Sequence, residues 1–192
     1  MSEHTKADLA ESLKKVLEHK PLDKITITDL TNDCGVNRQT FYYHFRDIYD
    51  LIEWMYLTKA NEAIGKNKTY DTWEEGMLDM CEVMLASKSF VLKTYHSRVQ
   101  EYLIPLLIKL SYNLMYGVVN ELSKDYVIVE KDKKFIADFY KFGFAGLIYT
   151  WVDEGMEADP HDFVQELEYL IKGNFLEAVK RYSNKENLKK IR

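Results

Sequence analysis

The sequence has 192 residues, of which 46% are hydrophobic, and its formal net charge is −5. This length and apolar content suffice for a buried core, in one domain or in a small domain beside a larger one. The two cysteines, Cys34 and Cys81, form no C-x-x-C pair, which argues against a disulfide framework or a zinc finger and fits a reducing cytoplasm. The N-terminus has no charged segment followed by an apolar run, so we expect no signal peptide.

The first predicted helix lies close to the N-terminus. Thr5, with Asp8 three positions later, resembles an N-terminal cap. Late positive charge and then Pro21 predict the end of the helix. Apolar residues recur between these points at the spacing of one helical face, at Leu9, Leu13, Val16 and Leu17.

Two short helices are predicted next. Thr26 is the expected N-cap of a helix at 28–34. Gly35 ends that helix, because glycine readily adopts a left-handed conformation. Asn37 is expected to cap a second short helix that runs to about His44.

The remainder of the chain is also predicted to be helical. Asp47 caps a fourth helix, and five more are expected at 72–86, 89–96, 99–122, 132–154 and 160–182. The expected fold is all-α with about nine helices: an N-terminal three-helix helix-turn-helix domain and a larger C-terminal bundle. The expected segments are a helix-turn-helix domain at 1–47, a connecting helix and joint at 48–71, a C-terminal domain at 72–183 and a frayed tail at 184–192.

Residues 26–45 have the pattern of a helix-turn-helix, in which two short helices cross at a sharp turn. No acidic residue occurs from Cys34 to Arg46, so the local potential suits phosphate although the chain is acidic. Arginine can read guanine and glutamine can read adenine, while tyrosine and threonine hydroxyls commonly bind phosphate. Such side chains lie between the buried positions of the second helix, at Arg38, Gln39, Thr40, Tyr42, Tyr43 and His44.

An ordinary helical hairpin is the alternative interpretation of the same residues. Aromatic stripes at helical spacing are usually core, and this stretch is rich in aromatic rings. Phe41 and Phe45 are core on both interpretations, so the two differ only in the role of the polar and tyrosine side chains.

The stretch from Ile25 to Phe45 resembles the DNA-binding domain of TetR-family transcriptional regulators. Its Gly-Val turn and Phe-Tyr-x-His-Phe ending carry the resemblance, which spans about residues 5–56. Within the family, residues 37–51 are similar to the dihydroxyacetone kinase regulators. Ile48 departs from the pattern, because many members have a phosphate-clamping lysine there; Arg46 is the expected substitute. The resemblance implies double-stranded DNA as partner, contacted by Thr26, Thr28, Asn37, Arg38, Gln39, Thr40, Tyr42, Tyr43, His44 and Arg46.

The resemblance also implies a homodimer, because two-fold dimers usually read two half-sites about one DNA turn apart. It places the dimer interface on the last two long helices, and glycines there would allow close approach. The alternative role of the same residues is intramolecular core. The residues expected at the interface are Phe139, Gly143, Gly146, Phe163, Leu167, Leu170 and Ile171.

An inducible regulator needs a ligand that prefers one of two arrangements of the protein. Residues 72–182 are rich in aromatic side chains, which suggests a pocket for a small apolar or aromatic effector. The alternatives are that the rings are core, or that a protein co-regulator acts instead, as for some dihydroxyacetone kinase regulators. The expected pocket residues are Tyr95, His96, Tyr102, Tyr112, Tyr116 and Phe142.

These features predict a sequence-specific regulator that represses from a palindromic operator and is released by a small molecule or a partner; the alternative is an activator. A helical enzyme and a DNA-independent adaptor are the rival classes. The sequence lacks G-x-S-x-G, H-E-x-x-H and Gly-rich phosphate motifs, and we expect no cofactor or metal. Polar residues interrupt the apolar segment 102–119, so we expect a core helix there, no membrane partner and a cytoplasmic protein.

Overall fold

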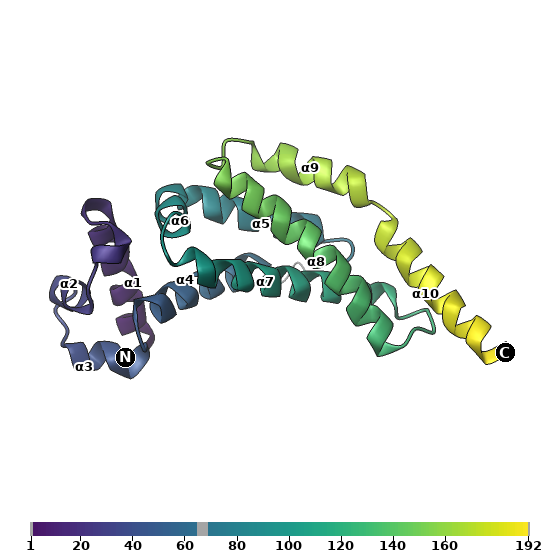
Figure 1. Ribbon diagram of the computed structural model, residues 1–192, viewed down its shortest axis with the longest axis horizontal. Coiled ribbons are helices and arrows are strands. Elements are labelled where there is room, and N and C mark those ends of the chain that lie inside the picture. Colours follow the sequence, from purple (N-terminus) through teal and green to yellow (C-terminus); the bar gives the residue numbers. More distant parts are fainter. Residues whose placement is uncertain (1, 65–68, 192) are drawn as a thin grey trace. The chain divides into compact units, whose positions relative to one another are not determined.

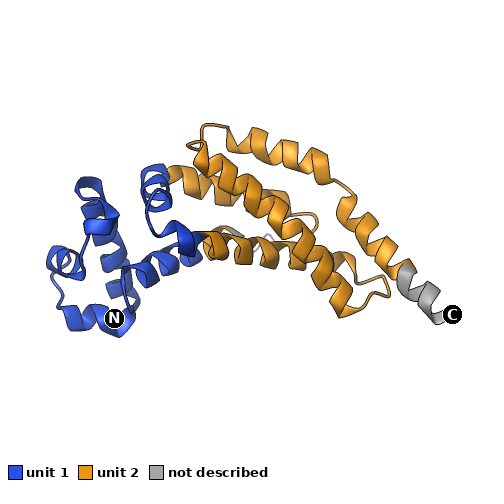
Figure 2. Cartoon of the chain, viewed as in Figure 1, with its two compact units in different colours: residues 1–59, 87–103 blue, residues 60–86, 104–192 orange. Residues whose placement is uncertain are grey.

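A computed structural model describes residues 2–64 and 69–191 of the chain. These residues form ten α-helices and one short 3-10 helix, and none of them lies in a strand (Figure 1). The all-α prediction is therefore confirmed. The chain divides into two compact units, which we call unit 1 and unit 2 (Figure 2). Unit 1 comprises Met1–Lys59 and Ser87–Leu103, and unit 2 comprises Ala60–Ala86 and Ile104–Arg192.

Unit 1 is built around its first helices. Their bounds are α1 Ser2–His19, the 3-10 helix η1 Leu22–Lys24, α2 Ile27–Asp33, α3 Arg38–His44, α4 Ile48–Ile64 and α6 Lys88–Tyr95, with the end of α4 belonging to unit 2. The predicted apolar stripe of α1 supplies Leu9 and Leu13, both fully buried. They share one core with Leu30 of α2, Phe41 of α3 and Leu51 of α4. Burial of such a core is the main favourable term in folding a unit of this size.

The start of the first helix differs from the prediction. We expected Thr5 to cap it, but α1 already begins at Ser2, so Thr5 lies inside the helix. A threonine followed by an acid three positions later is a weak signal, because the same pair is tolerated within a helical turn. The other caps, Thr26 and Asn37, lie where they were predicted.

Unit 1 contains a segment that we had assigned to the C-terminal domain. Residues 87–103 belong to unit 1, whereas the predicted segment 72–183 included them. The Tyr56 hydroxyl lies 2.6 Å from the Thr94 hydroxyl, and Lys93 Nζ donates to the Leu17 carbonyl at 3.0 Å. These contacts connect residues distant in sequence, which is why periodicity did not reveal them.

Unit 2 contains the longer helices. Their bounds are α5 Trp73–Ala86, α7 Gln100–Leu122, α8 Glu130–Asp153, α9 Pro160–Ile171 and α10 Asn174–Ile191, with the first residues of α7 in unit 1. Trp73 of α5 packs edge-on against Phe144 of α8, with ring centroids 5.5 Å apart, and also against Phe175 of α10 at 6.5 Å. All three rings are buried, so this aromatic cluster joins three helices of the unit.

The predicted last helix is in fact two helices. We expected one helix at 160–182, but α9 ends at Ile171 and α10 begins at Asn174. Gly173 lies between them with φ +80°, a left-handed conformation that ends a helix and that side chains rarely adopt. Helix α10 then continues to Ile191 through residues that we had predicted as a frayed tail.

Helix α7 alone among the described helices is long and apolar enough to cross a membrane, by length and composition. Leu114, Met115, Val118 and Val119 of this helix are at most 2% exposed. These side chains form part of the core of unit 2, as the sequence predicts for a core helix.

Candidate nucleic-acid interface

Helix α2 begins at a reciprocal N-terminal cap. The Thr26 hydroxyl accepts from the Asp29 backbone N–H at 3.2 Å, and the Thr26 N–H donates to Asp29 Oδ2 at 2.7 Å. Lys20 Nζ donates to the same carboxylate at 2.6 Å. The Lys20 hydrogen bond, with those from Thr26, lowers the pKa of Asp29 to about 2. The carboxylate therefore stays charged and fixes the start of α2.

The turn between α2 and α3 depends on Gly35. This residue has φ +68°, and the following Val36 N–H donates back to the Thr31 carbonyl at 3.0 Å. Asn37 then caps α3, because its Oδ1 accepts from the Thr40 N–H at 2.8 Å. Local sequence thus sets both the turn and the start of the second helix.

Helix α3 has one buried side and one exposed side. Phe41 is fully buried and Phe45 is 4% exposed, which confirms both as core. Between them, Tyr42 is 51% exposed and Tyr43 is 82% exposed. Arg38 lies over the Tyr42 ring and its Nη2 is 3.4 Å from the tyrosine hydroxyl. Arg38 and Gln39 are exposed, while Thr40 and His44 are half-buried.

The exposed side of α3 is free of acidic side chains, because residues 38–44 contain none. Thr26 and Thr28, at the start of α2, are exposed as well. The structure therefore places Arg38, Gln39, Tyr42 and Tyr43 on one exposed side of α3, and Thr26 and Asn37 at the starts of two consecutive helices. An arginine, a glutamine, hydroxyls and rings on one face can donate to base edges and phosphates.

The start of α4 differs from the exposed side of α3, because acidic side chains lie there. Arg46 is exposed, but its backbone N–H donates to Asp50 Oδ2 at 2.9 Å and its Nε lies 3.4 Å from the same oxygen. The Asp50 N–H in turn donates to Asp47 at 2.8 Å. Carboxylates of the chain itself thus occupy donors that could otherwise hold a phosphate.

Ile48 occupies the position of the expected phosphate-clamping lysine. It is half-buried and packs against the core of unit 1. The sequence showed the missing lysine, but it gave no sign that Asp50 pairs with Arg46, the expected substitute. The four-residue spacing of the pair was the available signal.

Two family descriptions match the chain. Residues 9–55 match "Bacterial regulatory proteins, tetR family", and residues 71–173 match "Transcriptional regulator C-terminal region" of the same family. The second match covers more than half of the chain. This chain belongs to the TetR family. It is a DNA-binding transcriptional regulator with the helix-turn-helix described above.

Related proteins are similar to this TetR-family chain at low sequence identity. The HTH-type dhaKLM operon transcriptional activator DhaS of Lactococcus lactis subsp. lactis (strain IL1403) is 23% identical over 91 residues, 47% of this chain and 49% of that protein. The match thus spans about half the length of that curated relative.

Solved structures share the fold. The dihydroxyacetone kinase operon activator DhaS has a TM-score of 0.70 at 19% identity, over 93% of this chain and 98% of that one. The TetR family repressor AlkX from Dietzia sp. strain DQ12-45-1b, implicated in biodegradation of n-alkanes, has a TM-score of 0.56 at 14% identity, over 91% and 96%.

The residues expected at a dimer interface fall into two groups, one exposed and one packed within unit 2. Phe139 is 71% exposed, and a Cβ added at Gly143 or Gly146 would meet nothing within 4 Å. On α9, Leu170 is 68% exposed.

The second group packs inside unit 2. Leu167 is 4% and Ile171 7% exposed, and Phe163 stacks on Trp151 with ring centroids 6.0 Å apart. These three side chains contribute to the core of the unit, which was the alternative role considered for them.

The residues expected in one effector pocket are divided between the units. Tyr95, His96 and Tyr102 belong to unit 1, where Tyr95 is buried and Tyr102 stacks on Tyr49 at 5.2 Å. The other three belong to unit 2, so neither unit contains the whole set.

In unit 2, the expected pocket residues have neighbours of their own. Tyr112 stacks on Tyr116, which donates to Glu130 at 2.6 Å. Phe142 is 59% exposed and lies beside Lys141. The sequence shows that these residues are aromatic, but it does not show which residue each ring contacts.

Proposed function

We propose that this regulator binds a palindromic operator as a homodimer, with α3 of each copy in the major groove. The exposed, acid-free face of α3 carries the proposal, because it presents Arg38 and Gln39 where base edges would lie. Thr26, Thr28, Asn37, Thr40, Tyr42, Tyr43, His44 and Arg46 supply the remaining contacts, mainly to phosphate.

The dimer interface is proposed on one face of α8. Its exposed apolar residues include Phe135, Phe139 and Phe142, at four- and three-residue spacing, and Leu147 five residues later. Phe135 and Leu147 were not predicted at any site, whereas Phe142 was expected in the effector pocket. Exposed rings beside two glycines with open space above them suit the close approach of an identical helix. On α9, Leu170 and the 87%-exposed Tyr169 are further exposed apolar side chains of unit 2.

Repression is the first candidate for the direction of regulation. A dimer that occupies a promoter excludes polymerase, and AlkX, which shares the fold, is named a repressor. Release would come from a small molecule or a partner protein, and the protein would act in the cytoplasm.

Activation is the second candidate. The curated relative and the structure with TM-score 0.70 are both named activators. A reporter fused to the promoter upstream of the chain's own gene separates the two: deletion of the regulator raises expression under repression and lowers it under activation.

The experiment that tests the proposed function is a titration of that upstream DNA with the full chain. We expect specific binding at two copies per operator, weakening steeply as salt rises. The Arg38→Ala, Tyr42→Ala variant should lose specific binding while its oligomeric state and helicity stay unchanged. Lys14→Ala, an exposed change on α1, is the matched control. Unchanged affinity in the double variant would exclude α3 as the recognition helix.

A further inference from the structure

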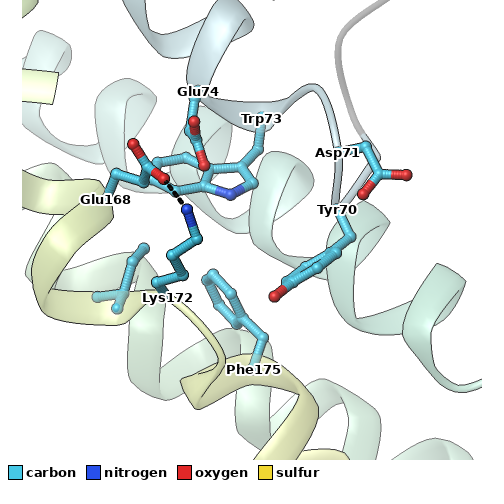
Figure 3. Close-up of a pocket in the computed structure, with 8 residues that line it drawn as sticks. Tyr70, Asp71, Trp73, Glu74, Glu168, Lys172 and Phe175 are labelled. Atoms are coloured by element: carbon cyan, nitrogen blue, oxygen red, sulfur yellow. Dashed lines mark hydrogen bonds and ion pairs between the residues drawn. The ribbon is translucent and has the colours of Figure 1, made fainter. Parts of the chain in front are cut away.

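Unit 2 contains a pocket that the sequence did not predict. It has a volume of about 210 Å³ and lies between the start of α5, the end of α9 and the start of α10 (Figure 3). Its lining consists of Tyr70, Asp71, Trp73, Glu74, Glu168, Ile171, Lys172 and Phe175.

The indole of Trp73 is the first sign that the pocket receives a ligand. Its side chain is 2% exposed, and Figure 3 shows the nitrogen edge of the ring turned toward the space beside Lys172 and Tyr70. Among the described residues, none accepts a hydrogen bond from this N–H. By contrast, the indole N–H of Trp151 donates to the Ala158 carbonyl at 2.9 Å. The ring is buried, but its N–H opens into the pocket, where the acceptor of a ligand can bind it.

The charge of the pocket is the second sign. Three carboxylates line it, from Asp71, Glu74 and Glu168, against one ammonium from Lys172. Lys172 Nζ already donates to Glu168 at 2.6 Å (Figure 3). Within the described part of the chain, neither a hydrogen bond nor an ion pair engages the Glu74 carboxylate. The pocket thus retains negative charge that is not neutralised.

The environment of Glu74 opposes its own ionisation. Partial burial, and then the nearby Glu168 carboxylate, raise the pKa of Glu74 above its usual value, and the Lys172 ammonium offsets only part of this rise. A cation beside Glu74 would relieve this repulsion, whereas an anion would add to it.

The wall of the pocket before α5 is held in place from within unit 2. The Tyr70 N–H donates to Glu121 Oε2 at 2.7 Å, and the Thr69 and Thr72 hydroxyls lie 2.7 Å apart. The aromatic side chains of Tyr70 and Phe175 supply apolar surface, which suits the alkyl groups of an organic cation better than a hydrated metal ion.

We propose that this pocket binds a small organic cation that carries a hydrogen-bond acceptor, with Glu74 facing the charge and the Trp73 N–H donating to the acceptor. The proposal that the pocket binds such a ligand does not depend on the proposed DNA-binding function. Its role as an effector site rests on the proposed function, because a ligand regulates only a chain that binds DNA.

Choline and its neutral isostere 3,3-dimethylbutan-1-ol are the probes. They share shape and hydroxyl and differ in charge. Isothermal titration of the full chain, without DNA, should show binding of choline and at least about tenfold weaker binding of the isostere. Equal binding of the two, tighter binding of acetate than of choline, or no binding of choline at millimolar concentration would each overturn the proposal.

Variants assign the binding to this pocket. Glu74→Gln should weaken choline binding at least about tenfold. Glu75→Gln is the matched control, because Glu75 is exposed and does not line the pocket, and its affinity should be unchanged. Trp73→Phe should weaken choline binding while thermal melts confirm that the variant folds. Unchanged affinity in Glu74→Gln would place choline elsewhere and overturn the assignment.

The regulatory role is measured separately, as the operator affinity with and without choline. A shift that Glu74→Gln abolishes supports an effector site. Choline binding without any DNA binding would contradict the proposed function and leave the ligand site standing. DNA binding without choline binding would do the reverse.

Discussion

Arg46 shows how one residue can limit the affinity of this regulator for DNA. It is the exposed cation closest in sequence to the start of α4, yet Asp50 accepts hydrogen bonds from its backbone and its side chain. The Asp50 carboxylate would repel a phosphate at the same place. Nonspecific binding should therefore be weak, because few cations near α3 are available for phosphate.

Asp50→Asn is expected to tighten operator binding by roughly two- to fivefold, since surface ion pairs have small effects. The amide oxygen can still accept from the Arg46 N–H, so the backbone geometry is retained. Fluorescence anisotropy at several salt concentrations measures the change, and the salt dependence should steepen by about one phosphate contact. In an Arg46→Ala background the gain should be smaller, because only the removal of the repulsion by the carboxylate remains; an equal gain there would show that the release of Arg46 contributes nothing.

Tyr56 shows a second residue-level effect, this time on stability. The Thr94 hydroxyl already donates to helix carbonyls at 2.9 Å, so the Tyr56 hydroxyl donates to it. Burial is the main cause that raises the pKa of Tyr56 to about 12. Tyr56→Phe should lower the free energy of unfolding by about 1 kcal/mol, as measured with urea.

The pH dependence of this contribution has a definite sign. An unfolded tyrosine has a pKa of about 10, and the folded value is about 12. The stability that Tyr56 contributes is therefore complete below about pH 10 and is lost as the pH rises toward 12. Tyr56→Phe should lack this alkaline loss, whereas Tyr43→Phe, an exposed control, should retain it.

At the scale of elements, what sequence could predict depended on how local the cause was. The caps at Thr26 and Asn37 act within three residues, and both were predicted. The break at Gly173 was missed because apolar periodicity continues on both sides of a single glycine. The exposed face of α3 was recognised from its composition and resemblance, and the structure added which residues of that face are half-buried.

Helix α8 offers the sharpest element-scale prediction. A Cβ at Gly146 meets nothing within 4 Å inside the protomer, so Gly146→Leu should leave the monomer fold intact. Leucine also has the higher helix propensity. In the proposed dimer the added side chain would hold the two α8 helices apart, and sedimentation should show a dimer dissociation constant raised at least about tenfold.

Asn113→Leu is the matched control for the α8 variant, because Asn113 is exposed on α7 and is not assigned to the interface. Its dimer affinity should equal that of the natural chain. If Gly146→Leu remained as dimeric as the control, the dimer interface would lie elsewhere.

At the scale of the whole molecule, the chain combines two units for which different ligands are proposed. Unit 1 contains the complete helix-turn-helix, and unit 2 contains both the exposed α8 face and the acidic pocket. The pocket could not be predicted from sequence, because its lining spans positions 70 to 175 and no motif connects them. The residues expected in the effector site are divided between the two units for the same reason, because shared aromatic character does not specify shared location.

The proposed function depends most on base recognition by α3, and selection of binding sites from a randomised DNA library tests this most directly. The natural chain should select one palindromic sequence. Arg38→Ala and Gln39→Ala should each lose preference at one position per half-site, at a cost of about 1–3 kcal/mol per position. Arg46→Ala should weaken all sequences alike. If the Arg38 and Gln39 variants selected the same sequence with the same preference as the natural chain, α3 would not be the element that reads DNA.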